Sequence, residues 1–312
     1  MELNKRLMIN ICGLYYEQDL TQQEIAKQLG LSRIKVSRLL KKAKADGIVK
    51  ISIDYSGTFL ELEHKLKEQY RLKNAVVVDG SASSSAKKKV AAAAALFLEN
   101  NLAAGTTLAA GWGTTLAQIP DFLHEGRVKK ILFSPIIGGH GRDIDIHASS
   151  ITARLAQKTA CDSLYLLSPA FAQTAAEKKI LLNDRVINEV LQRSAAADYA
   201  LFSLGNPMIK NSSAAMSGYF TGEEINYLHR EKVVCDVASV LFLDAECRPC
   251  CEEIFKRSIG IKAEELQKIP VKICVVEGVS KHLSVRTALR AKLIDVLILD
   301  DRTAHYLVDE AA

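Results

Sequence analysis

The sequence predicts an α/β protein of two domains, and two patterns along its 312 residues support this class. Residues 1–55 carry apolar side chains at helical spacing, whereas from residue 75 onward short apolar segments alternate with helical ones. Alternating strands and helices form a mostly parallel sheet that is covered by helices on both faces. We therefore expect a small helical domain over residues 1–55 and a larger α/β domain over residues 56–312.

The composition excludes several classes of protein. Apolar residues make up 48% of the chain and charged residues 25%, which is typical of globular proteins and not of collagen-like, low-complexity or disordered chains. No apolar run reaches the roughly 18–20 residues of a membrane span, and the N-terminus lacks a signal-peptide core. Seven cysteines, an odd number in a long chain, do not indicate a disulfide framework. We expect a cytoplasmic protein with no membrane partner and no cofactor.

The helical domain is predicted to contain three helices. Thr21 and Glu24 have the spacing of a capping box, in which each residue satisfies the backbone amide of the other. Gly30 turns the chain, and Ser32 is positioned to cap the third helix. The expected elements are helices over Leu3–Tyr16, 22–29 and Arg33–Ala45, followed by a short strand over Ile48–Ile53. The apolar face of the third helix is expected at Ile34, Val36, Leu39, Leu40 and Ala43.

A linker helix is expected over residues 58–70, at the start of the second domain. Phe59, Leu62, Leu66 and Tyr70 recur every three or four residues, with charged side chains between them. A narrow apolar stripe of this kind can pair with the same helix of a second copy, which is the interpretation we favour. The alternative is that the stripe packs on the domain that follows.

In the α/β domain, continuous apolar runs predict buried strands. The expected strands are Ala75–Val78, Lys130–Ile137, Ser163–Leu167, Tyr199–Leu204, Val271–Val276 and Asp295–Leu299, and Thr107–Gly113 is expected to be a strand that runs into a glycine loop. Helical patterns between them predict helices over Lys87–Asn101, Val186–Ala197 and Val285–Lys292.

The helical domain also carries most of the excess positive charge. Residues 27–50 contain eight basic residues and a single acidic one, Asp46, which is an electrostatic footprint for a polyanion. Two helices joined by a tight turn at Gly30 form a helix-turn-helix unit, whose second helix enters the major groove of DNA. A solvated basic helix in an ordinary bundle is the alternative, but caps, turn and basic helix each lie where the motif needs them.

The candidate DNA contacts fall into two groups. Arginine suits base recognition because its fork matches the O6 and N7 acceptors of guanine, whereas lysines further along the helix meet phosphates. The candidates are Thr21, Gln22, Ser32, Arg33, Lys35, Ser37, Arg38, Lys41 and Lys42. We therefore expect double-stranded DNA as a partner.

Several motifs together resemble one protein family. They are Leu14–Glu17, Leu20–Ala26, Leu29–Arg33, Val36–Leu40 and Asp46–Val49, and the similarity continues to the C-terminus. The chain resembles the SorC/DeoR family of bacterial sugar-binding transcriptional regulators. The resemblance implies a Rossmann-like effector domain similar to sugar-phosphate isomerases, assembly into homodimers or homotetramers, and control of an operon for sugar uptake or catabolism.

Two glycine-rich loops follow predicted strands. In the first, around Gly113, glycines let the backbone approach an anion, and free amides with two threonine hydroxyls can cradle phosphate. Such turns are common, but this one resembles the phosphate-binding loop of the family. In the second, Arg142 either completes the anion cage or is a solvated loop side chain. The expected effector contacts in the two loops are Gly111, Trp112, Gly113, Thr114, Thr115, Gly139, His140 and Arg142.

The resemblance assigns two more effector residues. Asp236 is similar to the family position at which an acidic residue accepts hydrogen bonds from sugar hydroxyls, and the alternative is an aspartate that caps its own loop. Lys281 matches the lysine of the family pattern Gly-Gly-Glu-x-Lys and would pair with phosphate. Cys235 and Val279 stand where the family has glycine.

Metal and thiol chemistry are not favoured. His140 and His147 lie near Asp143 and Asp145, but their spacing is not that of a metal-ligand set. Residues 247–251 contain a Cys-x-x-Cys core without a second pair of ligands, so incidental thiols are the preferred interpretation.

The sequence therefore favours a DNA-binding transcriptional regulator that is controlled by a phosphorylated sugar or polyol. The alternative from another class is an enzyme similar to sugar-phosphate isomerases or deaminases. Such chemistry needs a base near the carbonyl carbon of the substrate, and Asp145, Asp236 and His147 lie in no recognisable catalytic pattern. We expect the chain not to be an enzyme.

Overall fold

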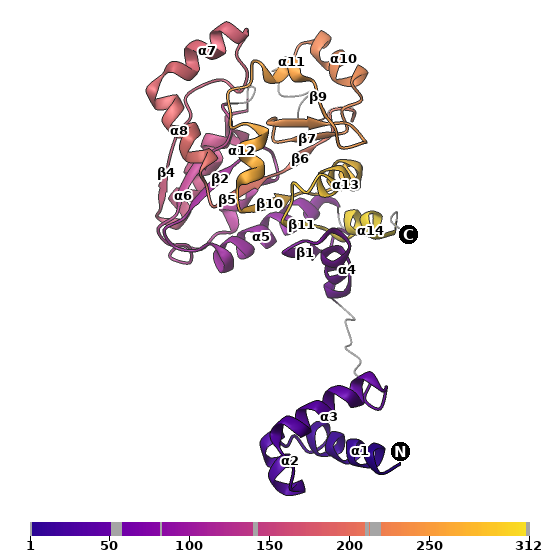
Figure 1. Cartoon of the computed structure of the whole chain (residues 1–312). Coiled ribbons are helices and arrows are strands. Elements are labelled where there is room, and N and C mark those ends of the chain that lie inside the picture. The colour runs from indigo at the N-terminus through magenta and orange to yellow at the C-terminus, as the bar shows by residue number, and fades with distance from the viewer. Residues whose placement is uncertain are drawn as a thin grey trace. The chain divides into compact units, whose positions relative to one another are not determined.

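The computed structural model describes residues 2–50, 58–81, 83–139, 143–209, 212 and 220–309. Its contacts divide the chain into two compact units, Met1–Ser56 and Gly57–Ala312. The first, the helical unit, contains only helices among its described residues, and the second, the α/β unit, combines sheets with helices (Figure 1). In the described part of the chain, no helix is long and apolar enough to cross a bilayer.

Both predicted helix caps form in the helical unit. The Thr21 hydroxyl accepts a hydrogen bond from the Glu24 amide at 3.3 Å, and the Glu24 carboxylate accepts one from the Thr21 amide at 2.8 Å. The Ser32 hydroxyl accepts from the Lys35 amide at 3.2 Å. Gly30 follows the second helix with a φ of 65°, which suits glycine. The helices described in this unit are α1 (Glu2–Tyr16), α2 (Gln22–Leu29) and α3 (Arg33–Ala45).

The three helices bury one apolar core, in which Ile11, Ile25 and Val36 have no exposed surface. One residue that we expected in this core is not there: Ile34 is 66% exposed. Positions 34 and 36 lie about 200° apart around a helix, so they cannot share a face. The strand predicted over residues 48–53 does not form at 48–50, because the amides of Ile48 and Val49 donate to the Ala43 carbonyl of α3, and residues 51–53 lie outside the described part.

The α/β unit is built on a parallel sheet, which confirms the predicted fold class. Among the described residues the sheet has seven strands in the order β1-β11-β10-β5-β2-β3-β4, and every neighbouring pair is parallel. The strands are β1 (Asn74–Val78), β2 (Thr107–Ala110), β3 (Leu132–Pro135), β4 (Asp162–Ser163), β5 (Tyr199–Phe202), β10 (Val271–Val275) and β11 (Val296–Asp300). Strand β4 is shorter than predicted, because its ladder with β3 ends at Ser163.

Helices cover both faces of this sheet. Alternate residues of β11 show the two faces, since Leu297 belongs to one apolar cluster and Ile298 to the other. The face of Ile298 packs against α5 (Ser83–Asn101), the 3₁₀ helix η1 (Leu116–Phe122) and α6 (Ala148–Thr159). The face of Leu297 packs against α4 (Leu60–Tyr70), α13 (His282–Arg290) and α14 (Asp301–Asp309). The remaining helices are α7 (Ala175–Asn183), α8 (Arg185–Ala195), α10 (Gly222–Arg230), α11 (Glu252–Phe255), α12 (Ala263–Lys268) and the short η2 (Ile144–Ile146) and η3 (Val279–Lys281).

A second, antiparallel sheet was not predicted from the sequence. The predicted strand Tyr199–Leu204 breaks at Ser203, so that β5 stays in the parallel sheet and the next residues start the new one. The order in this sheet is β6-β7-β8-β9, and its strands are β6 (Leu204–Gly205), β7 (Cys235–Val237), β8 (Leu241–Leu243) and β9 (Pro249–Cys250). Strands of two or three residues are too short to show a period of two in the sequence.

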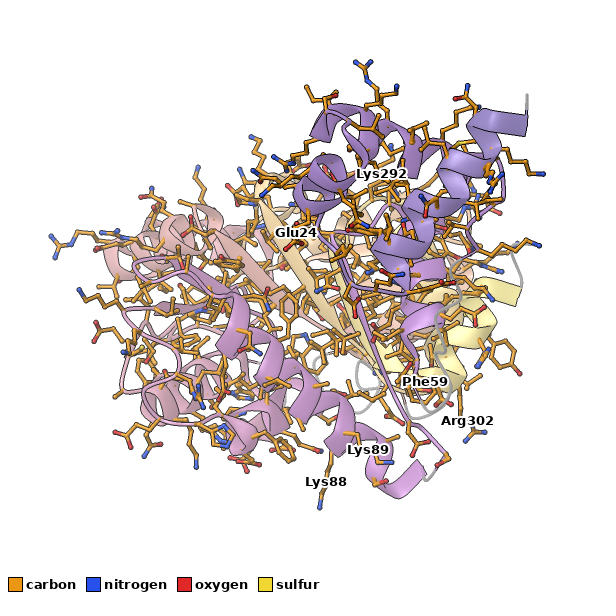
Figure 2. All side chains as sticks on the ribbon, turned by 90° about the horizontal axis from the view of Figure 1, so that it is seen from below. Glu24, Phe59, Lys88, Lys89, Lys292 and Arg302 are labelled. Atoms are coloured by element: carbon orange, nitrogen blue, oxygen red, sulfur yellow. The ribbon has the colours of Figure 1, made fainter. Side chains whose placement is uncertain are left out.

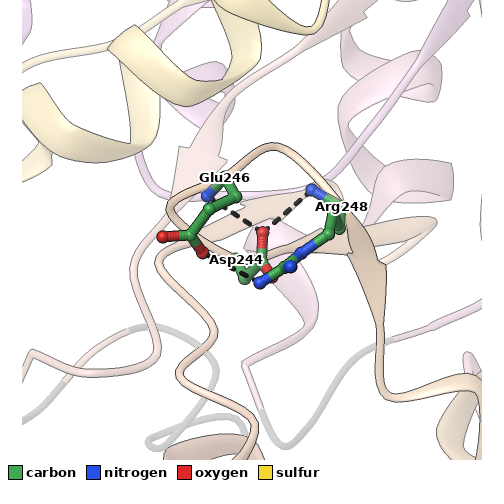
Figure 3. Close-up of polar contacts among 3 residues, drawn as sticks. All are labelled: Asp244, Glu246 and Arg248. Atoms are coloured by element: carbon green, nitrogen blue, oxygen red, sulfur yellow. Dashed lines mark hydrogen bonds and ion pairs between the residues drawn. The ribbon is translucent and has the colours of Figure 1, made fainter.

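A carboxylate fixes the turn between β8 and β9. Asp244 accepts hydrogen bonds from the amides of Glu246 and Arg248 at 3.0 and 2.9 Å, and from the Arg248 guanidinium at 2.8 Å (Figure 3). The Arg248 guanidinium also pairs with Glu246 at 3.1 Å. Desolvation raises the pKa of the Asp244 carboxyl, but this network outweighs it and holds the pKa below its usual value.

The apolar stripe of α4 packs within its own unit, so the expected pairing with a second copy is wrong and the packing alternative holds. Leu62 and Leu66 lie in the core beneath β1 and α14. The carbonyl of Leu307 in α14 accepts hydrogen bonds from the Tyr70 hydroxyl at 2.8 Å and the Gln69 amide at 3.1 Å. A stripe that is buried in one chain is not available to another.

We expect Leu66→Ala to lower the free energy of unfolding of the α/β unit by about 2–5 kcal/mol, because Leu66 is fully buried and its truncation leaves a cavity. Urea unfolding followed by circular dichroism measures this loss. The matched control is Leu60→Ala in the same helix, since Leu60 is 46% exposed and should change stability little. Equal losses in both variants would contradict the placement of α4.

Candidate functional site

A pocket opens at the carboxyl ends of two neighbouring parallel strands, β2 and β5. Strand β2 leads to β3 on one side, and β5 lies on its other side, so the strand order reverses between them. Ligands of open α/β sheets bind at such a switch point. The pocket is lined by Trp112, Gly113, Thr114, Thr115, Ser203, Leu204, Gly205, Asp236, Ala238 and Lys281. Six predicted effector residues therefore meet in one place.

The first glycine loop forms one wall of the pocket. Gly111 does not line it, but a side chain there would bring a Cβ to 3.1 Å from the Ala238 Cβ, so glycine permits the close approach of β2 and β7. Gly113 has a φ of 135°, a conformation that favours glycine. Among the described residues the amides of Thr114 and Thr115 donate to no carbonyl, which leaves them available to an anion. The helix that follows the loop is the 3₁₀ helix η1.

Two lysines face this loop. The Lys87 ammonium of α5 donates to the Thr114 hydroxyl at 3.2 Å. Burial and then the positive charge of Lys87 lower the pKa of Lys281, so the two ammonium groups are close enough to repel each other. Within the described residues neither lysine has a carboxylate oxygen within 4 Å. Two cations beside free amides form a site of positive potential.

The segment that carries Lys281 is held by a buried carboxylate. Asp300, at the end of β11, accepts from the Gly278 amide at 2.8 Å. It also accepts from the Thr303 amide at 2.9 Å and the Thr303 hydroxyl at 2.7 Å, at the start of α14. Because Asp300 is 2% exposed and fully hydrogen-bonded, it fixes the turn before Lys281.

Asp236, on β7, lines the same pocket and is 2% exposed. Its carboxylate accepts from the Ser239 amide at 2.6 Å, so it caps its own loop and also lines the pocket. A side chain at Gly205, its partner on β6, would place a Cβ 3.3 Å from the carboxylate. Burial raises the pKa of Asp236 to about 6, against the opposing effects of the Ser239 hydrogen bonds and the Lys281 charge.

This raised pKa predicts a pH dependence of stability. The folded state holds the Asp236 proton more tightly than the unfolded chain, so the free energy of unfolding should fall as pH rises from about 4 to 6 and stay level above. The fall amounts to about 3 kcal/mol at most. Asp236→Asn should lack this component, and urea unfolding of both proteins across this range measures the difference. If the free energies of unfolding of the two proteins differed by the same amount at every pH, the raised pKa of Asp236 would be contradicted.

The second glycine loop is described only in part, since His140 and Arg142 lie outside the described residues. Gly139 does not line the pocket: its amide donates to the Ser168 carbonyl and its carbonyl accepts from the Ala170 amide, both at 2.8 Å. Among the described residues no group of three histidine, cysteine or carboxylate side chains could hold a metal ion. All seven cysteines are free thiols.

Sequence reasoning missed part of the pocket. Ser203 lies near the end of the predicted strand Tyr199–Leu204 and Gly205 follows it, and this position at the carboxyl end of a strand was a usable signal. Lys87 carried no such signal, because one lysine of three in a row on a helix is indistinguishable from solvated charge. Only the packing of α5 beside η1 brings it to Thr114.

The candidate DNA contacts lie on the surface of the helical unit. Arg33, Lys35, Arg38 and Lys41 are exposed, and none of them has an ion-pair partner among the described residues. Lys42 differs, because its ammonium pairs with Asp46 at 3.0 Å. The hydroxyls of Thr21 and Ser32 already serve the helix caps, while Gln22 and Ser37 are half-buried.

Comparisons with known proteins agree for both units. Residues 55–309 match the family model Sugar-bind, a sugar-binding domain, and residues 10–45 match Sigma-70 region 4. The chain is 31% identical to the deoxyribonucleoside regulator of Bacillus subtilis (strain 168), with 98% of each chain covered. It is 27% identical to the sorbitol operon regulator of Klebsiella pneumoniae, with 97% of this chain and 98% of that protein covered.

Solved structures give the same result. The full-length sorbitol operon regulator SorC of Klebsiella pneumoniae superposes with a TM-score of 0.77 at 27% identity, over 97% of this chain and 99% of that one. A DeoR family transcriptional regulator from Listeria monocytogenes gives 0.73 at 31% identity, over 80% and 98%. These relatives are regulators and not enzymes, as predicted. The chain therefore belongs to the SorC/DeoR family of sugar-binding transcriptional regulators.

Proposed function

We propose that the chain binds operator DNA through the helical unit and a phosphorylated sugar or polyol through the α/β unit, and so controls a carbohydrate operon in the cytoplasm. The relatives named for deoxyribonucleosides and sorbitol support carbohydrate control. The observation that carries the phosphate assignment is the meeting of Lys87 and Lys281 at the loop of Thr114.

The groups that line the pocket suit both parts of one ligand. The lysines and the threonine amides give a phosphate dianion charge-assisted hydrogen bonds. The carboxylate of Asp236 accepts from hydroxyl groups of the carbon skeleton. An unphosphorylated sugar uses only this second set of contacts and leaves the two ammonium groups to repel each other.

The regulatory step is a shift between populations. A ligand changes DNA affinity only by its differential affinity for two arrangements of the protein. In a homodimer or homotetramer these arrangements differ in the spacing of the recognition helices, and half-site spacing sets affinity for the operator.

Thermal unfolding of the full-length protein tests the effector class. The panel contains phosphates of deoxyribose, hexoses and hexitols, each with its unphosphorylated parent, and inorganic phosphate. A ligand at 100 times its dissociation constant adds about 2.7 kcal/mol to stability. We expect stabilisation by a phosphorylated compound and not by its parent; stabilisation by parents alone would overturn the phosphate assignment.

A further inference from the structure

One large apolar side chain lies on the exposed face of α3, outside the core of the helical unit. Ile34 is 66% exposed, whereas the core-facing side of the same helix is formed by Val36, Leu40 and Ala43, which are buried. An isoleucine side chain that stays exposed to water does not gain the free energy that burial in an apolar core provides. A single exposed apolar residue is unremarkable by itself, so its neighbours decide what it means.

These neighbours are the candidate base contacts. On a helix, the positions adjacent to residue 34 are three and four residues further on, Ser37 and Arg38. Arg33 precedes it directly, and Lys41 follows one turn after Ser37 and Arg38. Ile34 therefore lies in the first turn of α3, within the surface that a helix-turn-helix unit presents to base edges.

The apolar side chain of Ile34 limits which chemical group of a base it can contact. In the major groove guanine, cytosine and adenine present polar edges, and thymine alone adds an apolar group, its 5-methyl. Isoleucine has no donor or acceptor, so it can gain from a base only by covering this methyl group. We propose that Ile34 is a specificity-determining residue that recognises the 5-methyl group of a thymine, an inference that rests on the proposed DNA binding.

The experiment isolates one methyl group. Full-length protein selects duplexes from a random-sequence library, and each thymine of a selected duplex is then replaced by deoxyuridine, which lacks only the methyl group. Fluorescence anisotropy at fixed salt gives the affinities. We expect deoxyuridine at one position of each half-site to weaken binding by the wild type about fourfold. Ile34→Ala should weaken binding to the thymine duplex similarly and make that position insensitive to the exchange.

Ile9→Ala is the matched control, because Ile9 is 53% exposed but lies on α1. This variant should keep the full response to deoxyuridine. A wild type that ignores the exchange at every thymine overturns the inference, and so does an Ile34→Ala variant that keeps the response. If Ile34→Ala instead changes the oligomeric state and leaves the response intact, Ile34 is a protein contact. Failure of the library to yield any duplex overturns DNA binding itself, which distinguishes the two failures.

Discussion

Replacing Arg33 and Arg38 together by alanine is expected to lower affinity for a selected operator duplex by about 100-fold or more. Both side chains are exposed on α3 and neither has an ion-pair partner among the described residues, so their guanidinium groups are available to guanine edges. Each bidentate contact contributes about 1–3 kcal/mol of discrimination. The substitutions remove no buried atoms, and alanine favours the helix, so the helical unit should remain folded.

The control for this variant removes the same charge elsewhere. Lys5 and Arg6 are exposed on α1, and their joint replacement by alanine also lowers the net charge of the unit by two. Fluorescence anisotropy at one salt concentration gives the affinity for the operator and the affinity for an unrelated duplex. The ratio of these two affinities is the specificity ratio. That ratio should collapse for Arg33→Ala/Arg38→Ala and persist for the control. An equal loss in the two variants would mean that α3 contributes only charge.

Lys281→Gln is expected to weaken binding of the phosphorylated effector by about 100-fold and to leave the affinity for its unphosphorylated parent unchanged. Lys281 lines the pocket, and hydrogen bonds to charged groups contribute about 1.5–3 kcal/mol each. Glutamine keeps a polar side chain of similar length at this position, and urea unfolding of the variant checks that the fold is kept, since Lys281 also interacts with the carboxylates of Glu277 and Asp236. Isothermal titration calorimetry with the effector found by the thermal screen measures both affinities.

Neighbouring lysines of α5 provide a matched pair for this prediction. Lys87→Gln should also weaken the phosphorylated effector, since Lys87 reaches Thr114. Lys88→Gln should not, because the Lys88 side chain is exposed and extends away from the unit (Figure 2). If Lys88→Gln weakens binding as much as Lys87→Gln, the effect is one of overall charge and the pocket assignment fails.

Local signals in the sequence predicted the elements whose causes are local. The capping box at Thr21 and the cap at Ser32 depend on residues three apart, so reading the sequence was enough to place α2 and α3. The central parallel strands were visible because burial on both faces favours continuous apolar runs, as β11 shows, whereas the edge strand β4 (Asp162–Ser163) is polar and was placed less well. Within the pocket, residues in glycine turns and in family motifs could be named in advance.

Other features depend on partners distant in sequence. The antiparallel sheet exists because Gly205 meets Asp236 and Phe242 meets Cys250, and no strand of it is long enough to show a pattern. The stripe of α4 was recognised, but whether it covers a second copy or its own sheet depends on α14, where Leu307 lies 237 residues after Tyr70. Ile34 was misplaced for a local reason, because the helical spacing that excludes it from the face of Val36 was not applied.

The position of Trp112 has a practical consequence. It is the only tryptophan of the chain, it lines the pocket, and the helical unit has none. Its emission therefore gives effector affinity with and without operator, while a dye on the duplex gives operator affinity with and without effector. Thermodynamic reciprocity requires the two coupling free energies to be equal. One sample thus gives the coupling free energy between effector and operator twice, from two independent optical signals. A difference between the two values would reveal a change in assembly that neither signal reports alone.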